Sequence, residues 1–118
     1  MSLLKTIDLN PSEAPRESRV DPERLVEGNP LLKSWPADLA RDGKIKTGVW
    51  QGTPGVNKSI KGETFEFCYI IEGVVELTPE GGEPVIYRAG DCFIMKPGYI
   101  GLWRTIETVK KLYVVVEG

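Results

Sequence analysis

Glu66 is the residue whose type and position most suggest chemistry. It lies in an otherwise apolar run, Phe65 to Ile71. Successive side chains of a strand alternate between its two faces, so Glu66, Cys68 and Ile70 share one face. Both faces are largely apolar, which predicts a strand covered on both sides, where a carboxylate needs a cation or hydrogen-bond donors. Glu66 is therefore a candidate pocket group and, equally, a candidate member of a structural ion pair.

The elements that would position Glu66 are short β-favouring runs. From residue 44 onward such runs alternate with glycine and proline turns, at the spacing typical of an all-β barrel or sandwich. No helical period persists beyond residue 41. The predicted strands are 44–50, 56–60, 64–71, 73–78, 84–87, 91–96, 100–106 and 109–116.

The N-terminal part has a different composition. Residues 1–20 mix proline, serine and charged side chains, which favours an extended or loosely held arm lying on the barrel or on a partner. Asp21 before Pro22, an acidic first turn and a stop at Gly28 predict one short helix. The segment 30–43, which contains Trp35, is expected to be a loop. We therefore assign residues 1–27 to an arm with a short helix and 28–118 to one barrel domain.

Composition excludes several classes of protein. The chain has 118 residues, 41% of them hydrophobic, which suits one domain with one core. Its 15 Lys and Arg and 17 Asp and Glu are not segregated, so neither nucleic acid nor an anionic membrane is an expected partner. No apolar run approaches the roughly 18 residues that span a bilayer. We expect a cytoplasmic protein in which Cys68 and Cys92 are reduced, buried thiols.

The chain resembles the cupin superfamily at both of that superfamily's motifs. The first motif ends in a glutamate, six residues and a glycine, as Glu66 to Gly73 do here. The second contains an Ala-Gly-Asp turn and a Pro-Gly corner, similar to Ala89-Gly90-Asp91 and Lys96-Pro97-Gly98. Other segments resemble the small cupins related to ureidoglycine aminohydrolase and ethanolamine-utilisation proteins: Gly28-Asn29-Pro30, Trp35, Asp42-Gly43, Gly48-Val49-Trp50, Thr53-Pro54-Gly55, Tyr69-Ile70-Ile71-Glu72-Gly73, Gly101-Leu102-Trp103 and Lys111-Leu112-Tyr113.

This resemblance runs from about residue 28 to 116. It implies an all-β, cupin-type double-stranded β-helix (jelly-roll) barrel, here with an N-terminal arm and one short helix. Cupin-like barrels commonly associate in twos, so a homodimer is expected, and the arm is a candidate for exchange between subunits.

The metal ligands of a typical cupin are absent. Such a cupin has a His-x-His pair four or five residues before the glutamate and a third histidine after the Pro-x-Gly corner. Here these positions fall among residues 59–62 and on Gly101, and the chain contains no histidine. Zinc on Glu66, Cys68, Cys92 and Asp91 is disfavoured because the cysteines form no closely spaced pair. We expect no metal and no other cofactor.

Without a metal, the expected counter-charge for Glu66 is a basic side chain on a neighbouring strand or at the rim. Lys96 leads into the Pro-Gly corner, and the resemblance places Lys111 beside the mouth. Trp103 shares a strand face with Gly101 and would point into the cavity, and the family pattern puts Trp50 at the same rim. Together with Cys68 these residues would form a small-molecule pocket. Each also has a structural explanation, core packing for the tryptophans and solvated head groups for the lysines.

Three hypotheses about function remain open. The first is a metal-independent cupin that binds a small polar or anionic metabolite in the lumen. The second is an enzyme acting on a small nitrogenous compound by aminohydrolase-like or lyase-like chemistry, with Glu66 as the catalytic acid or base and its pKa raised by burial. The third is a structural or assembly module that binds a protein through the N-terminal arm.

Overall fold

The computed structural model describes residues 2–118, and Met1 lies outside the described range. Within that range the protein is all β, as predicted, and has no helix, so none that could cross a membrane. Its nine strands are β1 Arg16–Arg19, β2 Leu25–Gly28, β3 Leu31–Ala40, β4 Ile45–Gly52, β5 Gly55–Ile60, β6 Phe65–Pro79, β7 Val85–Arg88, β8 Cys92–Met95 and β9 Ile100–Val116.

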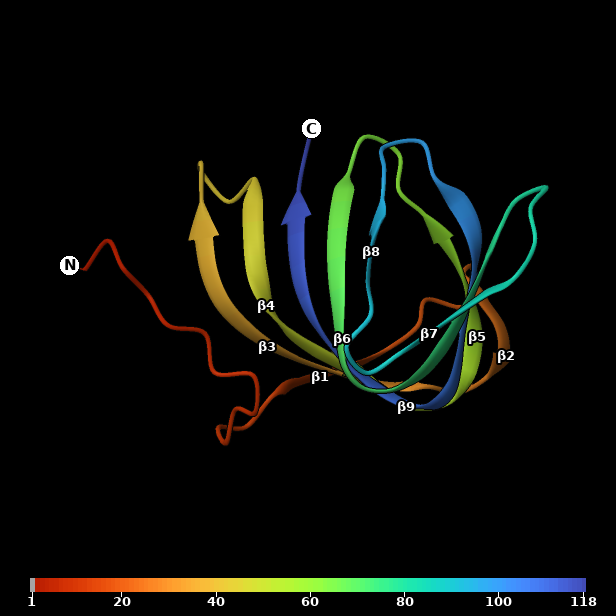
Figure 1. Ribbon diagram of the computed structural model, residues 1–118, viewed down its shortest axis with the longest axis horizontal. Coiled ribbons are helices and arrows are strands. Elements are labelled where there is room, and N and C mark those ends of the chain that lie inside the picture. The colour runs from red at the N-terminus through yellow and green to blue at the C-terminus, as the bar shows by residue number, and fades with distance from the viewer. Residues whose placement is uncertain (1) are drawn as a thin grey trace.

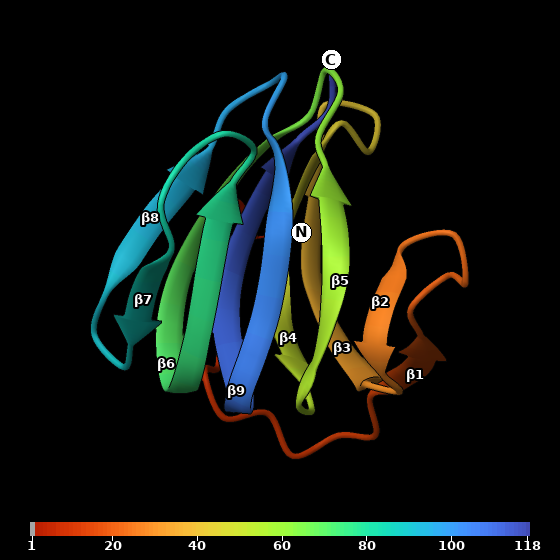
Figure 2. The ribbon, with the colours of Figure 1, turned by 90° about the vertical axis from the view of Figure 1, so that its right-hand side faces the viewer.

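The strands form an antiparallel sheet that curls into a half-barrel with two layers (Figure 1). One layer has the order β1, β3, β4, the C-terminal half of β9, the N-terminal half of β6, and β8. The other layer has β2, β5, the N-terminal half of β9, the C-terminal half of β6, and β7 (Figure 2). The long strands β6 and β9 therefore belong to both layers and hold them together.

Gly73 lies at the bend where β6 passes from one layer to the other. The pairing of β6 with β9 shifts register on both sides of this residue. Its φ is +93°, a conformation that favours glycine, and a Cβ there would collide with the backbone of Thr108 and Val109. A side chain at this position would block the close approach of the two strands.

The core lies between the two layers. Along the first half of β6, buried and half-buried residues alternate, with Glu66, Cys68 and Ile70 facing inward as predicted. The buried hydrophobic residues are Val49, Val56, Cys68, Ile70, Val75, Leu77, Met95, Trp103 and Val109. Four buried residues are polar or charged, namely Glu66, Thr105, Lys110 and Lys111, so the interior contains charges that need partners.

The predicted short helix was wrong. Asp21 starts a single turn in which its carbonyl accepts from the backbone N–H groups of Arg24 (2.8 Å) and Leu25 (3.0 Å). The chain then continues as β2, because Leu25 and the residues after it pair with β5. The helix-start residues from Asp21 onward form one turn only, because pairing of the next residues with β5 prevents a helix from continuing.

The predicted loop at 30–43 was also wrong, because residues 31–40 form strand β3. Pro36 does not break this strand. Strand β1 pairs with β3 only over Leu31 to Ser34, so Pro36 lies beyond that pairing, at a register shift between β3 and β4. A proline is tolerated at such edge positions and bulges since no ladder hydrogen bond needs its missing N–H.

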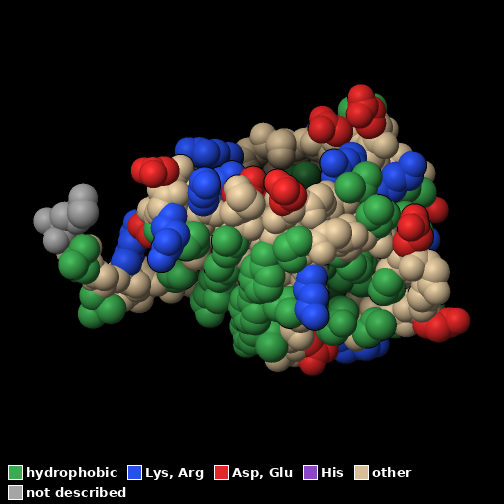
Figure 3. All heavy atoms as spheres, turned by 90° about the horizontal axis from the view of Figure 1, so that it is seen from above, with side chains coloured by type: hydrophobic (Ala, Val, Ile, Leu, Met, Phe, Trp, Pro, Cys, Tyr) green, Lys and Arg blue, Asp and Glu red, His purple; other side chains and the backbone are tan. Residues whose placement is uncertain are grey.

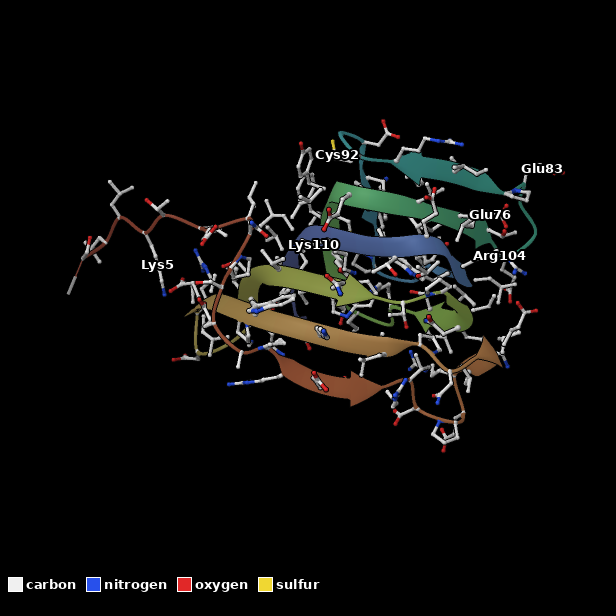
Figure 4. All side chains as sticks on the ribbon, turned by 90° about the horizontal axis from the view of Figure 1, so that it is seen from below. Lys5, Glu76, Glu83, Cys92, Arg104 and Lys110 are labelled. Atoms are coloured by element: carbon white, nitrogen blue, oxygen red, sulfur yellow. The ribbon has the colours of Figure 1, made fainter. Side chains whose placement is uncertain are left out.

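An extended arm was expected over residues 1–20, on the barrel or on a partner, but residues 16–19 form strand β1, and the segment before β1 is the part that contacts the barrel. The Trp35 indole donates to the carbonyl of Glu13 (2.9 Å), and Lys110 donates to the Asn10 side chain (3.3 Å). Lys5 approaches Asp38 at 3.5 Å, and Figure 4 shows it reaching out from the arm while Lys110 lies among the strands. The arm thus covers Lys110, which sits 5.8 Å from the centre of the Trp35 ring.

Candidate functional site

The candidate site is built around the Glu66 carboxylate, each oxygen of which accepts a hydrogen bond from a lysine. Lys111 Nζ lies 2.8 Å from Oε2, and Lys61 Nζ lies 2.5 Å from Oε1. The side chains of Glu66 and Lys111 are 7% and 9% exposed, and that of Lys61 is 16% exposed. The three charges are therefore a largely dehydrated cluster in which Lys61 is the member most open to solvent.

Local structure explains how the three side chains meet. Glu66 and Lys111 project inward from the paired strands β6 and β9, where Ile70 is directly opposite Lys111. Lys61 follows the end of β5, and its backbone N–H donates to the carbonyl of Tyr99 (2.9 Å). The turn after β5 is closed by a hydrogen bond from Thr64 N–H to the Lys61 carbonyl (2.9 Å). These hydrogen bonds hold the backbone of Lys61 in place, and its side chain reaches the Glu66 carboxylate from there.

Two tryptophans enclose the Lys111 ammonium. Its nitrogen lies 4.6 Å from the centre of the Trp50 ring and 4.5 Å from that of Trp103. The two rings are themselves edge to face, with centres 5.7 Å apart. Trp103 is oriented further by a hydrogen bond from its indole N–H to the Thr105 hydroxyl (3.0 Å). Desolvated cation–π contacts of this kind stabilise a buried ammonium by about 2 kcal/mol.

The pKa of Glu66 is low, which corrects the expectation that burial raises it. Burial by itself does raise the pKa, but the charges of Lys111 and Lys61 and their hydrogen bonds outweigh burial. The net pKa is about 2, against an ordinary value of 4.5. Glu66 is therefore ionised at neutral pH and has no proton to donate.

The groups next to Glu66 keep their protons. Burial alone would lower the pKa of Lys111, but Cys68 and Glu66 beside it raise the pKa above its usual value. Burial raises the pKa of the Cys68 thiol to about 12, and that thiol donates a hydrogen bond to Glu66 Oε2 (3.3 Å). At neutral pH the cluster thus contains two ammonium groups, one carboxylate and one neutral thiol.

A cavity of about 220 Å³ opens beside this cluster. Viewed from above, the surface of the molecule is hollowed, with both basic and acidic side chains beside the hollow (Figure 3). The residues that line the cavity come from the Asp21 turn, β4, β5, β6, β8 and β9: Arg24, Trp50, Asn57, Lys58, Ser59, Ile60, Lys61, Glu66, Met95, Trp103 and Lys111.

The structure brings together most of the residues singled out from the sequence. Glu66, Trp50, Trp103 and Lys111 line the cavity, and Cys68 contacts Glu66 from the core side. Lys96 does not join them, because it is exposed and lies outside the cavity lining. Of the two lysines considered as the counter-charge of Glu66, the structure selects Lys111.

Lys61 is the site residue that sequence reasoning missed. It lies five residues before Glu66, within the segment 59–62 where the resemblance places the paired histidines of other cupins. This position was the signal that could have identified Lys61. A lysine in the place of a metal-ligating histidine brings its ammonium group to the same glutamate. Cys92 corrects the expectation of two buried thiols. It is an exposed free thiol at the edge of the molecule (Figure 4), whereas Cys68 is buried.

The residues at the mouth do not fit a divalent metal ion. Both oxygens of Glu66 accept from ammonium groups, and the Cys68 thiol stays protonated. No ligand can project from Gly101, since a Cβ there would collide with the Tyr99 hydroxyl oxygen and the Thr78 carbonyl. Within residues 2–118, moreover, no three Cys, Asp or Glu side chains gather into a metal-binding group.

The family profile described as "EutQ-like cupin domain" matches residues 39–113, which include the whole Glu66 cluster. The chain belongs to the EutQ-like cupin family. None of the curated proteins compared matches this EutQ-like cupin.

Solved structures show the same fold. A protein with unknown function from Pseudomonas syringae pv. tomato superposes with a TM-score of 0.82 at 26% identity, over 93% of this cupin and 46% of that chain. This cupin therefore spans less than half of the P. syringae protein. The Clostridium difficile EutQ protein gives 0.64 at 12% identity over 75% and 64% of the two chains. The P. lautus ectoine synthase gives 0.64 at 19% identity over 84% and 68%.

Proposed function

We propose that this EutQ-like cupin binds a small anionic metabolite in its lumen without the help of a metal ion. The observation that carries the proposal is the imbalance of charge at the cavity. Two ammonium groups, on Lys61 and Lys111, face one carboxylate, so the buried cluster holds one positive charge that no described side chain neutralises. A desolvated positive charge is stabilised most effectively by a bound anion.

The cavity suggests how the chain would hold such an anion. Lys61 is the more exposed of the two lysines, so its ammonium is the group that a carboxylate entering from solvent can reach. The Asn57 amide and the Ser59 hydroxyl line the same cavity and can donate further hydrogen bonds. Trp50 and Trp103 provide the apolar wall that a small ligand's carbon skeleton requires.

The size of the cavity limits the ligand. At about 30 Å³ for each water in the liquid, 220 Å³ corresponds to about seven waters. A ligand of roughly seven to ten non-hydrogen atoms, partly open to solvent, would therefore fill it.

Binding can be tested by isothermal titration calorimetry with butyrate as the probe. The purified protein is expected to bind butyrate, and Lys61→Gln to weaken the affinity by about tenfold, the equivalent of one charge-assisted hydrogen bond. Lys96→Gln is the matched control, since it removes the same charge outside the cavity. Equal butyrate affinity in the two variants would contradict the proposal.

The enzyme hypothesis survives only in a restricted form. With a pKa of about 2, Glu66 cannot serve as a general acid at neutral pH. It could accept a proton or stabilise a developing positive charge, and both roles need the ionised carboxylate. If such catalysis occurs, Glu66→Gln should abolish turnover while the fold is retained, and unchanged turnover would remove Glu66 from the chemistry.

We also propose that the protein forms a homodimer through the outer face of the layer that contains β4, β6 and β8. Phe67 is opposite Ile94 and Val114 on this face, and Tyr69 is opposite Leu112. Four of these residues are half-buried in the single chain and Ile94 is 48% exposed. Such an apolar sheet face is typical of an interface between subunits. Light scattering should give twice the chain mass, and Phe67→Glu should halve it.

A reducing compartment such as the cytoplasm suits both thiols. Cys68 and Cys92 are unpaired in the structure, and they lie on strands β6 and β8 with one buried and one exposed. A protein purified without reductant should therefore retain two titratable thiols after unfolding.

A further inference from the structure

The mouth of the cavity continues outward into a second, basic region. This outer pocket is lined by Arg19, Val20, Asp21, Arg24, Leu32, Trp50, Asn57 and Lys58. Four of these residues, Arg24, Trp50, Asn57 and Lys58, also line the inner cavity. The two spaces therefore share a wall, with the Lys61 and Lys111 ammonium groups at the inner cavity and Arg24 at the boundary between the two spaces.

A backbone hydrogen bond holds the turn that carries Arg24 against β5. The turn that starts at Asp21 fixes the backbone of Arg24, and the Arg24 carbonyl accepts from the N–H of Lys58 (2.7 Å). Lys58 lies on β5, three residues before Lys61, so its side chain starts on the opposite face of the strand from that of Lys61. The segment expected to be a helix thus serves instead to place a guanidinium at the mouth.

The rim has positive charges in excess. Among the ion pairs found in residues 2–118, none involves Arg24 or Lys58. Asp21 is the single carboxylate that lines the outer pocket, against Arg19, Arg24 and Lys58. The Arg19 guanidinium already has one hydrogen-bond partner, because it donates to the Asn29 carbonyl (2.7 Å). The protein as a whole has a net charge of −2, so this concentration of positive charge is local to the mouth.

We infer that the ligand of this cupin is a small dianion, with one acidic group at Lys61 and a second at Arg24. This inference rests on the proposed function and names the class of ligand. One anion at the inner cluster would leave the rim charges unpaired, whereas an acid with groups at both ends of its carbon chain would neutralise both. A planar guanidinium such as that of Arg24 is suited to a carboxylate or phosphate.

Arg24 lines both spaces, so a ligand whose second acidic group reaches it fills the inner cavity and extends a little beyond it. Dicarboxylic acids of four or five carbon atoms have about eight or nine non-hydrogen atoms, enough to fill the inner cavity of about 220 Å³. Succinate and glutarate are therefore suitable probes.

The test compares acids of equal carbon number by calorimetry at low salt, where exposed charges are least screened. Succinate is expected to bind at least about tenfold more tightly than butyrate, which corresponds to one additional charge-assisted contact. Replacing the rim guanidinium by Arg24→Gln should abolish this advantage. The matched control is Arg88→Gln, which removes the same charge from an exposed position outside both pockets and should keep the advantage.

The outcomes separate the two proposals. If butyrate binds and depends on Lys61 but succinate binds no better, the dianion inference is wrong and the anion site stands. If neither acid binds, the proposed function itself is wrong. If the control substitution Arg88→Gln removes the advantage as well, net charge and not Arg24 explains it, which also overturns the inference. A further titration with phosphonoacetate distinguishes a phosphate-type second group, if it binds more tightly than succinate, from a second carboxylate.

Discussion

Acidification should reveal how much the Glu66 cluster contributes to stability. The folded protein holds the pKa of Glu66 at about 2, whereas the ordinary value is 4.5. Because the folded pKa is the lower one, the contribution is fully present above pH 4.5 and is lost as the pH falls toward 2. At about 1.4 kcal/mol per pKa unit, the full contribution is about 3 kcal/mol, of which about 2 kcal/mol is lost by pH 3.

The measurement is the unfolding free energy from urea denaturation at pH 7 and pH 3, for the wild type and for Glu66→Gln. The amide cannot titrate, so the stability difference between the two proteins should shrink by about 2 kcal/mol at the lower pH. Glu72→Gln is the control, because Glu72 pairs with Lys110 at 3.5 Å but has a 62% exposed side chain. Its effect should stay within about 1 kcal/mol. A Glu66→Gln difference that is the same at both pH values would refute the reasoning.

Three further predictions follow from packing and charge. Lys111→Met removes one charged hydrogen bond to the carboxylate while Lys61 still pairs with it, and should lower the unfolding free energy by about 1.5–3 kcal/mol in urea denaturation. Iodoacetamide at pH 8 should label exposed Cys92 and spare Cys68, whose pKa is about 12, as mass spectrometry of the native protein would show. Gly73→Ala should destabilise more than Gly90→Ala, because both glycines have φ of +93° but a Cβ at Gly90 meets nothing. Equal melting temperatures for these two variants would contradict the collision at the bend.

Local patterns in the sequence were enough to predict the strands that flank the site. The alternation of apolar residues around Glu66 gave the correct inward face, and the apolar surroundings correctly implied a buried counter-charge. Glycine marked the bend at Gly73, although the runs on either side of it are one continuous strand. Similarly, the two runs predicted near the C-terminus are the single strand β9. Bulges permit this continuity, and a bulge leaves no clear mark in sequence.

Features that depend on tertiary pairing could not be predicted in the same way. Strand β3 contains Pro36, which in the sequence favours a loop, and the edge position that accommodates this proline is visible only once β1 and β4 are in place. The direction of the Glu66 pKa shift depends on the two ammonium groups of Lys111 and Lys61 together, and no local pattern shows how many cations meet a buried carboxylate. The exposure of Cys92 likewise follows from its outward register opposite Tyr69.

The sharing of β6 and β9 between both layers bears on how the chain folds. Neither layer has a complete set of strands of its own, so neither is expected to form a stable intermediate, and amide hydrogens in both should exchange through the same global opening. The pairings join segments far apart in the sequence, as when β4 meets the C-terminal half of β9. Folding should accordingly take milliseconds to seconds, as in other β proteins of high contact order. Lys61 and Lys111 are therefore expected to meet Glu66 together only when the strands of both layers have paired.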